Sequence, residues 1–169
     1  GGMHARLLDL QSREILTRFR LHGAVASADV APDGGHVVTG SWDRSAKFWD
    51  VAQQRAERKL DGVHAGPINC VRYHPRGDLV LTASDDGTVR LWDPATGAAK
   101  SPPLRVSDGR VLDAAFSPNG QWILTASDDK TARIFSVEDH SQHIRFVGHE
   151  WAVLRARFAS DGRFVITGS

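Results

Sequence analysis

The sequence comprises 169 residues, of which 41% are hydrophobic and 24% charged, a balance ordinary for a soluble globular domain with one sizeable core. The 21 Lys and Arg side chains nearly cancel the 20 Asp and Glu side chains, so the basic excess typical of nucleic-acid-binding domains is missing. No apolar run approaches the roughly 18 residues of a membrane-spanning helix, and the first residues lack the apolar segment of a signal peptide. Neither nucleic acid nor membrane is therefore an expected partner.

Cysteine usage favours a reducing compartment. Cys70 is the single cysteine of the sequence, so the chain cannot form an internal disulfide. Together with the missing signal segment, this indicates a cytoplasmic protein.

The first predicted elements are two short strands, at residues 5–10 and 14–20, and a longer pattern follows them. In this pattern an apolar residue leads into a tight turn, an apolar strand, an acidic turn and a second strand. Complete copies run over 30–50, 73–93 and 116–136, and a fourth copy opens at 158 and continues to 169. The leading residues of the four copies are separated by 43, 43 and 42 positions. A fixed period of this length is typical of propellers and solenoids.

Local sequence chemistry within each copy is that of β-structure. The tight turns contain Pro-x-Gly or Ser-Asp-Gly, in which Pro fixes φ and Gly adopts a positive φ. The segments between turns are short and rich in Val, Ile, Leu, Thr and aromatic residues, as at 79–82, 88–92 and 122–125. No window shows a 3.6-residue apolar period bounded by helix caps, so we expect an all-β fold.

A Trp-Asp pair closes the last strand of two copies, at Trp49-Asp50 and Trp92-Asp93. With these pairs and four phased copies, the chain resembles the WD-repeat family over essentially its whole length. The resemblance implies a β-propeller of four-stranded antiparallel blades, whose strands a to d are counted outward from a central channel. The predicted units are strands c and d of a split blade at 1–20, whole blades at 21–62, 63–105 and 106–147, and strands a and b of the split blade at 148–169.

The two predicted half-blades need partners, because unpaired edges of apolar strands are a template for association. If one chain joined its own ends, the product would be a closed four-bladed monomer. If the ends of two chains combined, the product would be one eight-bladed ring. The fourfold ring turns about 90° per blade and would need larger side chains at its periphery, a gradient that the repeats lack, so we expect the C2 homodimer. The residues expected at this closure are Leu7, Leu8, Phe164, Val165 and Ile166.

The resemblance also implies a buried hydrogen-bonded set in each blade: a His before strand a, a Ser or Thr on strand b, an Asp in the b–c turn and the Trp of strand c. Such polar groups are tolerated in a core only when they are paired. The matching residues are His64, Ser84, Asp86 and Trp92 in the blade at 63–105, Ser41, Asp43 and Trp49 in the blade before it, Ser127 and Asp129 in the blade after it, and His149 in the split blade. In the blade at 106–147, Ser107 replaces the His and Phe135 replaces the Trp.

Two chemical alternatives to this structural interpretation are less favoured. A catalytic triad of His64, Ser84 and Asp86 is disfavoured because Ser-x-Asp recurs in the b–c turns and no Gly-x-Ser-x-Gly elbow is present. The acidic pairs at 85–86 and 128–129 lack the alternating ligands and distant Glu of a calcium loop. We therefore expect no enzymatic activity, no catalytic residue, no metal site and no cofactor.

The d–a and b–c turns of WD-like propellers share one face, where partner peptides often dock. Exposed Trp and Arg side chains are typical energetic anchors of interfaces. The candidate partner-binding residues on this face are Trp42, Arg44, Pro67, Arg110, Glu150 and Trp151. The alternative is that each Trp merely packs on an adjacent blade.

The leading functional hypothesis is a protein–protein interaction scaffold that pairs with itself as a homodimer and binds other proteins or peptides. Two alternatives stay open. One is an engineered or excised half-propeller without a native ligand, and the other is an accessory or sensor domain of a larger enzyme.

Overall fold

The computed structural model describes residues 4–8, 11, 13–20, 23–53, 55–60 and 64–169. Sixteen β-strands lie within these ranges, and they form five antiparallel sheets. The same ranges contain no helix of the length and apolarity needed to cross a membrane. The all-β prediction is confirmed.

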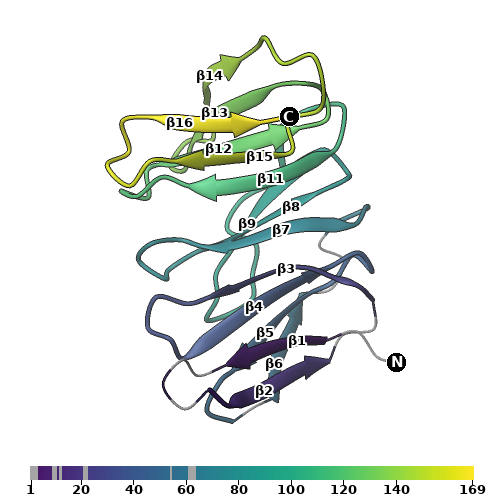
Figure 1. Ribbon diagram of the computed structural model, residues 1–169, viewed down its shortest axis with the longest axis vertical. Helices are drawn as coiled ribbons and strands as arrows, with labels where there is room; N and C mark the ends of the chain where they lie inside the picture. The colour runs from purple at the N-terminus through teal and green to yellow at the C-terminus, as the bar shows by residue number, and fades with distance from the viewer. Residues whose placement is uncertain (1–3, 9–10, 12, 21–22, 54, 61–63) are drawn as a thin grey trace.

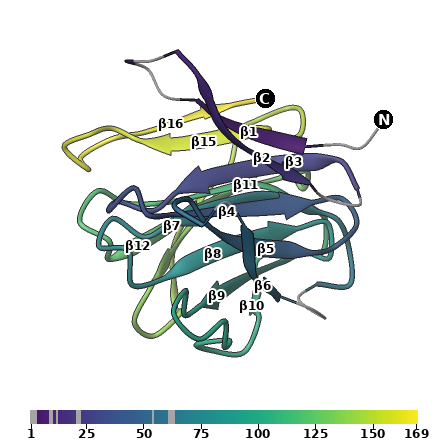
Figure 2. The ribbon, with the colours of Figure 1, turned by 90° about the horizontal axis from the view of Figure 1, so that it is seen from below.

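Three of the sheets have four strands, and each of these sheets is called a blade below. The first blade comprises β3 (Val25–Val30), β4 (His36–Ser41), β5 (Ala46–Asp50) and β6 (Arg55–Leu60). The second comprises β7 (Ile68–Tyr73), β8 (Val80–Ser84), β9 (Thr88–Trp92) and β10 (Leu104–Arg105). The third comprises β11 (Val111–Phe116), β12 (Trp122–Ser127), β13 (Ala132–Ser136) and β14 (Gln142–Phe146). The strands follow one another in chain order across each sheet, as β3 to β6 show in Figure 2.

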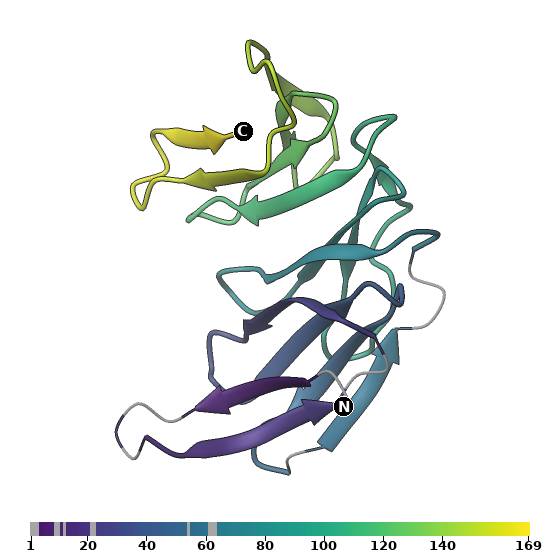
Figure 3. The same cartoon turned by 45° about the vertical axis from the view of Figure 1, so that its right-hand side comes forward.

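The other two sheets are strand pairs at the ends of the row of blades. The N-terminal pair consists of β1 (His4–Leu8) and β2 (Ile15–Arg20), and the C-terminal pair of β15 (Arg155–Phe158) and β16 (Val165–Gly168). The two pairs lie at opposite ends of the molecule (Figures 1 and 3). Among the residues that the structure describes, β1 is not hydrogen-bonded to β16. The blades therefore form an open row, not a ring closed by one chain.

Hydrogen bonds between inner strands join the first blade to the second, the second to the third, and the third to the C-terminal pair. They run from the Tyr73 amide to Asp29 Oδ2 (2.7 Å), from the Cys70 thiol to the Ala114 carbonyl (3.3 Å) and from the Ala156 amide to Asp113 Oδ2 (3.2 Å). The partners in each bond are 43 or 44 residues apart, which is one repeat. The inner strands β3, β7, β11 and β15 accordingly succeed one another along the row (Figure 1).

The hydrophobic core lies between the blades, not at one centre. Phe48 of the first blade packs with Val71 and Val80 of the second. Leu81 of the second blade packs with Ile123 of the third. All five residues of β8 are buried, as expected for a sheet covered on both faces. Each fully buried Val, Leu, Ile or Phe contributes about 1.5–3 kcal/mol, so every blade stabilises its neighbours.

Two kinds of turn repeat along the chain, and they differ in the residue type that adopts a positive φ. The β7–β8 turn uses Gly77 at φ 78°, and a Gly with positive φ stands at the same place in the other three copies. The β8–β9 turn uses Gly87 at φ 80°, whereas Arg44 (φ 70°) and Lys130 (φ 68°) adopt this conformation in the neighbouring blades. A residue with a Cβ pays roughly 1 kcal/mol in this region, so the b–c turns of the first and third blades are slightly strained.

Candidate binding face and its buried polar sets

The second blade holds a continuous buried chain of hydrogen bonds. The side chain of His64 is fully buried, with Nδ1 2.9 Å from Asp86 Oδ2 and Nε2 2.8 Å from Thr82 Oγ1. The Trp92 indole N–H donates to the same Thr82 hydroxyl at 3.0 Å. Because the Asp86 carboxylate can only accept, neutral His64 carries its proton on Nδ1, and the Thr82 O–H donates to Nε2. Every polar atom along this chain is paired.

The hydroxyl that links His and Trp was predicted wrongly. Ser84 was expected in this role, but Thr82, two residues earlier on β8, occupies it. The first blade repeats the correction, because the Trp49 indole donates to Thr39 at 2.9 Å and not to Ser41. Residues two apart on a strand point to the same side, so the residue types alone did not separate the two candidates.

The face formed by the d–a and b–c turns is called the candidate face below. The serines at the ends of the b strands hydrogen-bond to both kinds of turn on this face. Ser84 donates to the Gly66 carbonyl at 3.0 Å and accepts from the Asp86 amide at 3.1 Å. Ser41 and Ser127 make the same pair of bonds in their own blades. Each serine therefore ties a d–a turn to a b–c turn, which brings these two kinds of turn to one face.

The b–c turn aspartates are hydrogen-bonded in the same way in all three blades. Oδ1 of Asp43, Asp86 and Asp129 accepts from the amide and hydroxyl of Ser45, Thr88 and Thr131, respectively. Burial alone would raise the pKa of Asp86, but hydrogen bonds from Thr88 and His64 outweigh it and hold this pKa below its ordinary value. Burial lowers the pKa of His64, and the nearby Asp86 offsets this only in part, so His64 is neutral at pH 7.

In the third blade, different residues make the hydrogen bonds of the polar set. Ser107 stands where His64 stands in the second blade, and its hydroxyl contacts the Ser127 hydroxyl at 2.8 Å. The second carboxylate oxygen of Asp129 then receives Arg133 Nη2 at 2.6 Å. Arg133, a strand residue that the sequence did not single out, thus replaces the missing imidazole.

The C-terminal pair contains part of such a set. His149 Nε2 lies 2.8 Å from Thr167 Oγ1, and His149 Nδ1 lies 3.1 Å from Ser169 Oγ. By the repeat alignment, the Asp and Trp positions of this set fall at Gly2, which lies outside the described residues, and at Leu8, which is 54% exposed.

The acidic pairs are occupied by protein donors. Asp85 accepts from the Asn69 side chain at 2.6 Å, and Asp128 accepts from the amide and the guanidinium of Arg110 at 2.7 and 2.8 Å. Within the described ranges, no group of three or more His, Cys, Asp or Glu side chains is arranged to hold a metal ion.

The candidate face carries two strongly exposed tryptophans. The exposed fraction is 60% for Trp42, in the b–c turn of the first blade, and 74% for Trp151, in the turn before β15. Arg44, Arg110 and Glu150 are exposed as well, whereas Pro67 is half-buried and its carbonyl accepts from the Asp85 amide at 3.0 Å. The structure pairs Arg110 with Asp128, and it leaves the two tryptophans on separate blades.

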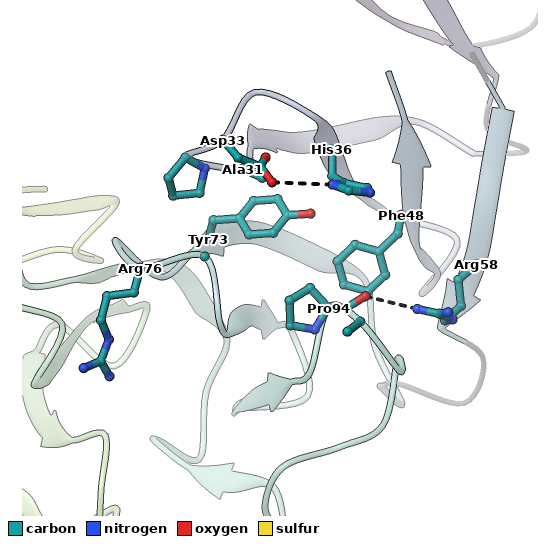
Figure 4. A pocket seen from close by; sticks show the side chains of 11 residues that line it. Ala31, Asp33, His36, Phe48, Arg58, Tyr73, Arg76 and Pro94 are labelled. Carbon is teal, nitrogen blue, oxygen red and sulfur yellow. Dashed lines mark hydrogen bonds and ion pairs between the residues drawn. The ribbon is translucent and has the colours of Figure 1, made fainter. Parts of the chain in front are cut away.

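A hollow that the sequence did not predict lies between the first and second blades, at the a–b and c–d turns (Figure 4). Its volume is about 440 Å³, and the rings of Phe48 and Tyr73 meet there at a centroid distance of 6.3 Å. Arg58 donates to the Pro94 carbonyl at 3.0 Å across one side of the hollow. The hollow therefore has an aromatic wall and a charged rim, at the strand ends opposite to the tryptophans.

Comparison with known families decides the identity of the repeats. Residues 13–50, 58–93, 102–136 and 140–169 each match the family model described as WD domain, G-beta repeat. The chain belongs to the WD-repeat family. The resemblance based on the Trp-Asp pairs is confirmed.

Several known proteins are similar to part of the chain. The chain is 49% identical over 45 residues to the U5 small nuclear ribonucleoprotein 40 kDa protein of Pongo abelii, a match that covers 27% of this chain and 12% of the relative. It is 34% identical over 79 residues to the target of rapamycin complex subunit LST8 of Bos taurus, covering 44% of this chain and 24% of the relative. It is 36% identical over 52 residues to the ribosome biogenesis protein ERB1 of Malassezia globosa, covering 31% and 6%. The matched WD repeats thus span a quarter or less of these relatives.

Proposed function

We propose that this WD-repeat chain is a protein-interaction scaffold whose partner docks on the candidate face. The observation that carries the proposal is the exposure of Trp42 and Trp151, at 60% and 74%, on turns that the blades hold rigidly. Aromatic anchors on a rigid support bind with little loss of conformational entropy. The printed names of the relatives, a ribonucleoprotein, a complex subunit and a biogenesis factor, fit a role inside multiprotein assemblies and an intracellular site of action.

Binding is favoured over catalysis by the positions of the reactive side chains. His64 and Thr82 are buried, and Ser84 contacts Gly66 and Asp86. The Thr88 hydroxyl beside His64 donates to Asp86 at 2.6 Å, so each of these hydroxyls is held inside the blade by hydrogen bonds. The same arrangement of turn serine and aspartate recurs from blade to blade, as expected of a group that stabilises the fold.

The docking face is tested by cross-linking. A photoreactive amino acid placed at position 42 or 151 should capture a partner in extracts of cells that express the chain. The Trp42→Ala, Trp151→Ala double variant should lose the partner that the unmodified chain retains. Arg76→Ala, at a 74% exposed side chain in an a–b turn, is the matched control and should keep it. A partner that survives the double variant and is lost with Arg76→Ala would move the docking site to the other face.

We further propose that two copies combine into one eight-bladed ring through their terminal strand pairs. Among the described residues, the outer edge of β16 and one edge of β1 have no strand beside them. Apolar side chains are exposed close to both edges, including Leu8 (54%), Phe164 (64%) and Ile166 (72%). Exposed apolar strands with open edges favour strand pairing.

Two hollows lie beside the terminal strand pairs, where the strands of a second copy would pack. An apolar hollow of about 580 Å³, lined by Trp122, Ile134 and Phe158 among others, lies beside the C-terminal pair where strands c and d of a blade would pack. A smaller hollow of about 150 Å³, lined by Leu7, Phe19 and Val30 among others, lies beside the N-terminal pair. The N-terminal pair of one copy would cover the first hollow, and the C-terminal pair of the other copy would cover the second.

The second blade supplies the register for a test with cysteines. Leu81 of strand b faces Leu91 of strand c there, and the corresponding residues of the terminal pairs are Ile166 and Leu7. The Leu7→Cys, Ile166→Cys variant should form disulfides under mild oxidation and give a species of twice 18.5 kDa. Leu8→Cys, Ile166→Cys is the matched control, because a shift by one residue turns the side chain to the other face.

The alternative closures give different results. A disulfide that forms within a species of 18.5 kDa would indicate the closed four-bladed monomer. A chain that stays at 18.5 kDa in light scattering over a wide concentration range, and forms no disulfide, would refute self-assembly and fit strands supplied by another polypeptide segment. The docking proposal is independent of this outcome, because Trp42 and Trp151 lie on turns outside both edges.

A further inference from the structure

A polar cleft lies between the outer strands of the second and third blades. It has a volume of about 440 Å³, and its lining includes Arg105, Asp108, Asp129, Arg133, Gln142 and Arg145. Three guanidinium groups thus face two carboxylates, which gives the cleft a net charge of +1 (three positive minus two negative). The cleft was not predicted from the sequence, because its three arginines come from three strands, β10, β13 and β14.

The arginine at the base of the cleft is only partly neutralised. The Arg133 side chain is 9% exposed, and its Nη2 is bound by Asp129 at 2.6 Å. Its Nη1 is buried and has no hydrogen-bond partner among the described residues. A buried charged donor without an acceptor is costly, and native structures usually satisfy it with water, an ion or a ligand.

The arginine on the next strand increases this excess of positive charge. Arg145 of β14 is the register partner of Arg133 on β13, so the two side chains lie on the same face of the sheet. Like charges directly opposite each other on neighbouring strands are destabilising, unless an anion lies between them. Arg105 completes the rim, and its partner Asp108 is fully exposed, so that surface pair is weak and easily exchanged.

The aspartate at the base is ionised, and Arg133 balances its charge. Burial would raise the pKa of Asp129, but hydrogen bonds from Thr131 and Arg133 outweigh it and hold this pKa below its ordinary value. Both of its oxygens are already bound, Oδ1 by Thr131 and Oδ2 by Arg133. The carboxylate therefore orients the guanidinium and leaves Nη1 for another acceptor.

We propose that this cleft binds a phosphate monoester, with Arg133 Nη1, Arg145 and Arg105 as the donors. A dianion offers one acceptor oxygen to each guanidinium, and guanidinium–phosphate hydrogen bonds are among the strongest in proteins. A single carboxylate has one charge and two oxygens, so it matches three guanidinium groups less well than a dianion with three oxygens. The group is carried either by a small phosphorylated molecule or by a phosphorylated side chain of a protein.

The test is a titration of the 169-residue chain with inorganic phosphate, O-phosphoserine and a phosphoserine peptide, at constant ionic strength. The NMR signals of the arginine Nε–H groups are the readout. The signals of Arg133 and Arg145 should shift and saturate. Arg145→Gln and Arg105→Gln should each weaken binding about tenfold, the usual effect of losing one charge-assisted hydrogen bond. Arg76→Gln, in an a–b turn, is the matched control and should bind as the unmodified chain does.

Comparison of the ligands identifies the source of the phosphate. Tighter binding of the phosphoserine peptide than of O-phosphoserine indicates a phosphorylated protein, and equal binding indicates a small molecule. Shifts that do not saturate, or that persist unchanged in Arg145→Gln, would overturn the proposal. Equal binding of a peptide with Glu in place of phosphoserine would overturn the choice of a dianion. None of these outcomes depends on whether a protein docks at Trp42 and Trp151.

Discussion

The second and third blades have the same four strands in the same order. The aspartate of the b–c turn nevertheless has a different partner in each blade. In the second blade, His64 reaches Asp86 from the preceding turn and also binds Thr82, which in turn binds Trp92. In the third blade, Arg133 reaches Asp129 from within the sheet. Ser107 and Phe135 stand there in place of the His and the Trp of the set. The turn aspartate thus needs a cationic or N–H partner, but the fold does not fix where that partner comes from.

The choice of partner changes the surface of the blade. The imidazole of the second blade uses both nitrogens inside the core. The guanidinium of the third blade binds Asp129 through Nη2, and its buried Nη1 has no hydrogen-bond partner among the described residues. The same arginine lines a polar cleft. The arginine that holds the turn aspartate of the third blade therefore also contributes positive charge to the cleft.

The largest expected difference between the two blades concerns the threonine on strand b. Thr82→Val should lower the free energy of unfolding by about 2–4 kcal/mol, because both Trp92 Nε1 and His64 Nε2 lose a buried partner. The matched change Thr125→Val should cost about 1 kcal/mol or less, because Thr125 makes one long bond, 3.4 Å, to the Arg133 carbonyl. Urea denaturation measures both. Equal losses would contradict the distinction between the blades.

A second difference should appear on acidification. Because the pKa of His64 is lowered in the folded chain, the unfolded chain binds a proton at this site more readily. The contribution of neutral His64 to the free energy of unfolding is therefore present above pH 6.5 and is lost as the pH falls below that value. Denaturation midpoints from pH 7.5 to 5.5 should fall more steeply for the unmodified chain than for His64→Gln. Asp86 and Asp129, whose pKa values are lowered, lose their contributions only as the pH falls below about 3.8. Parallel curves above pH 5 would refute the role of His64.

The third blade can be given the missing indole. Phe135 lies ten residues after Thr125, as Trp92 does after Thr82 and Trp49 after Thr39. Phe135→Trp should stabilise the chain by about 0.5–1 kcal/mol if the indole donates to Thr125. A double-mutant cycle with Thr125→Val isolates this bond from changes in packing. A coupling energy of zero would show that the third blade no longer accommodates the set.

The smallest stability effect is expected on the candidate face. Trp42→Ala and Trp151→Ala should each change the free energy of unfolding by about 0.5 kcal/mol or less, because both side chains are mostly exposed. Thermal melts of the single variants check this. A loss of several kcal/mol would indicate that the tryptophans pack on neighbouring blades and serve the fold.

The period and the turn chemistry were sufficient to predict the all-β blades, because each repeat carries its own strand and turn signals. Closure into an eight-bladed ring stays a prediction. The exposed tryptophans were also predicted, since both occupy turn positions that the repeat leaves variable. The threonine of the polar set was missed because Thr82 and Ser84 point to the same side of β8, and only the structure shows which one meets Trp92. Arg133 was missed for another reason. Its role depends on the space left by Ser107, 26 residues earlier, and periodicity does not report such compensation.

The position of Cys70 between the second and third blades has a practical consequence. Burial raises the pKa of its thiol to about 12, and the thiol donates to the Ala114 carbonyl, so it is neither ionised nor accessible at neutral pH. Alkylating reagents act on the thiolate, and they should leave this residue untouched in the folded chain. A cysteine introduced at position 42 or 151 would then accept a single fluorophore without removal of the native one. The chain can thus be labelled at a chosen site without removing Cys70. Labels at both positions would report the distance between the first blade and the turn before β15.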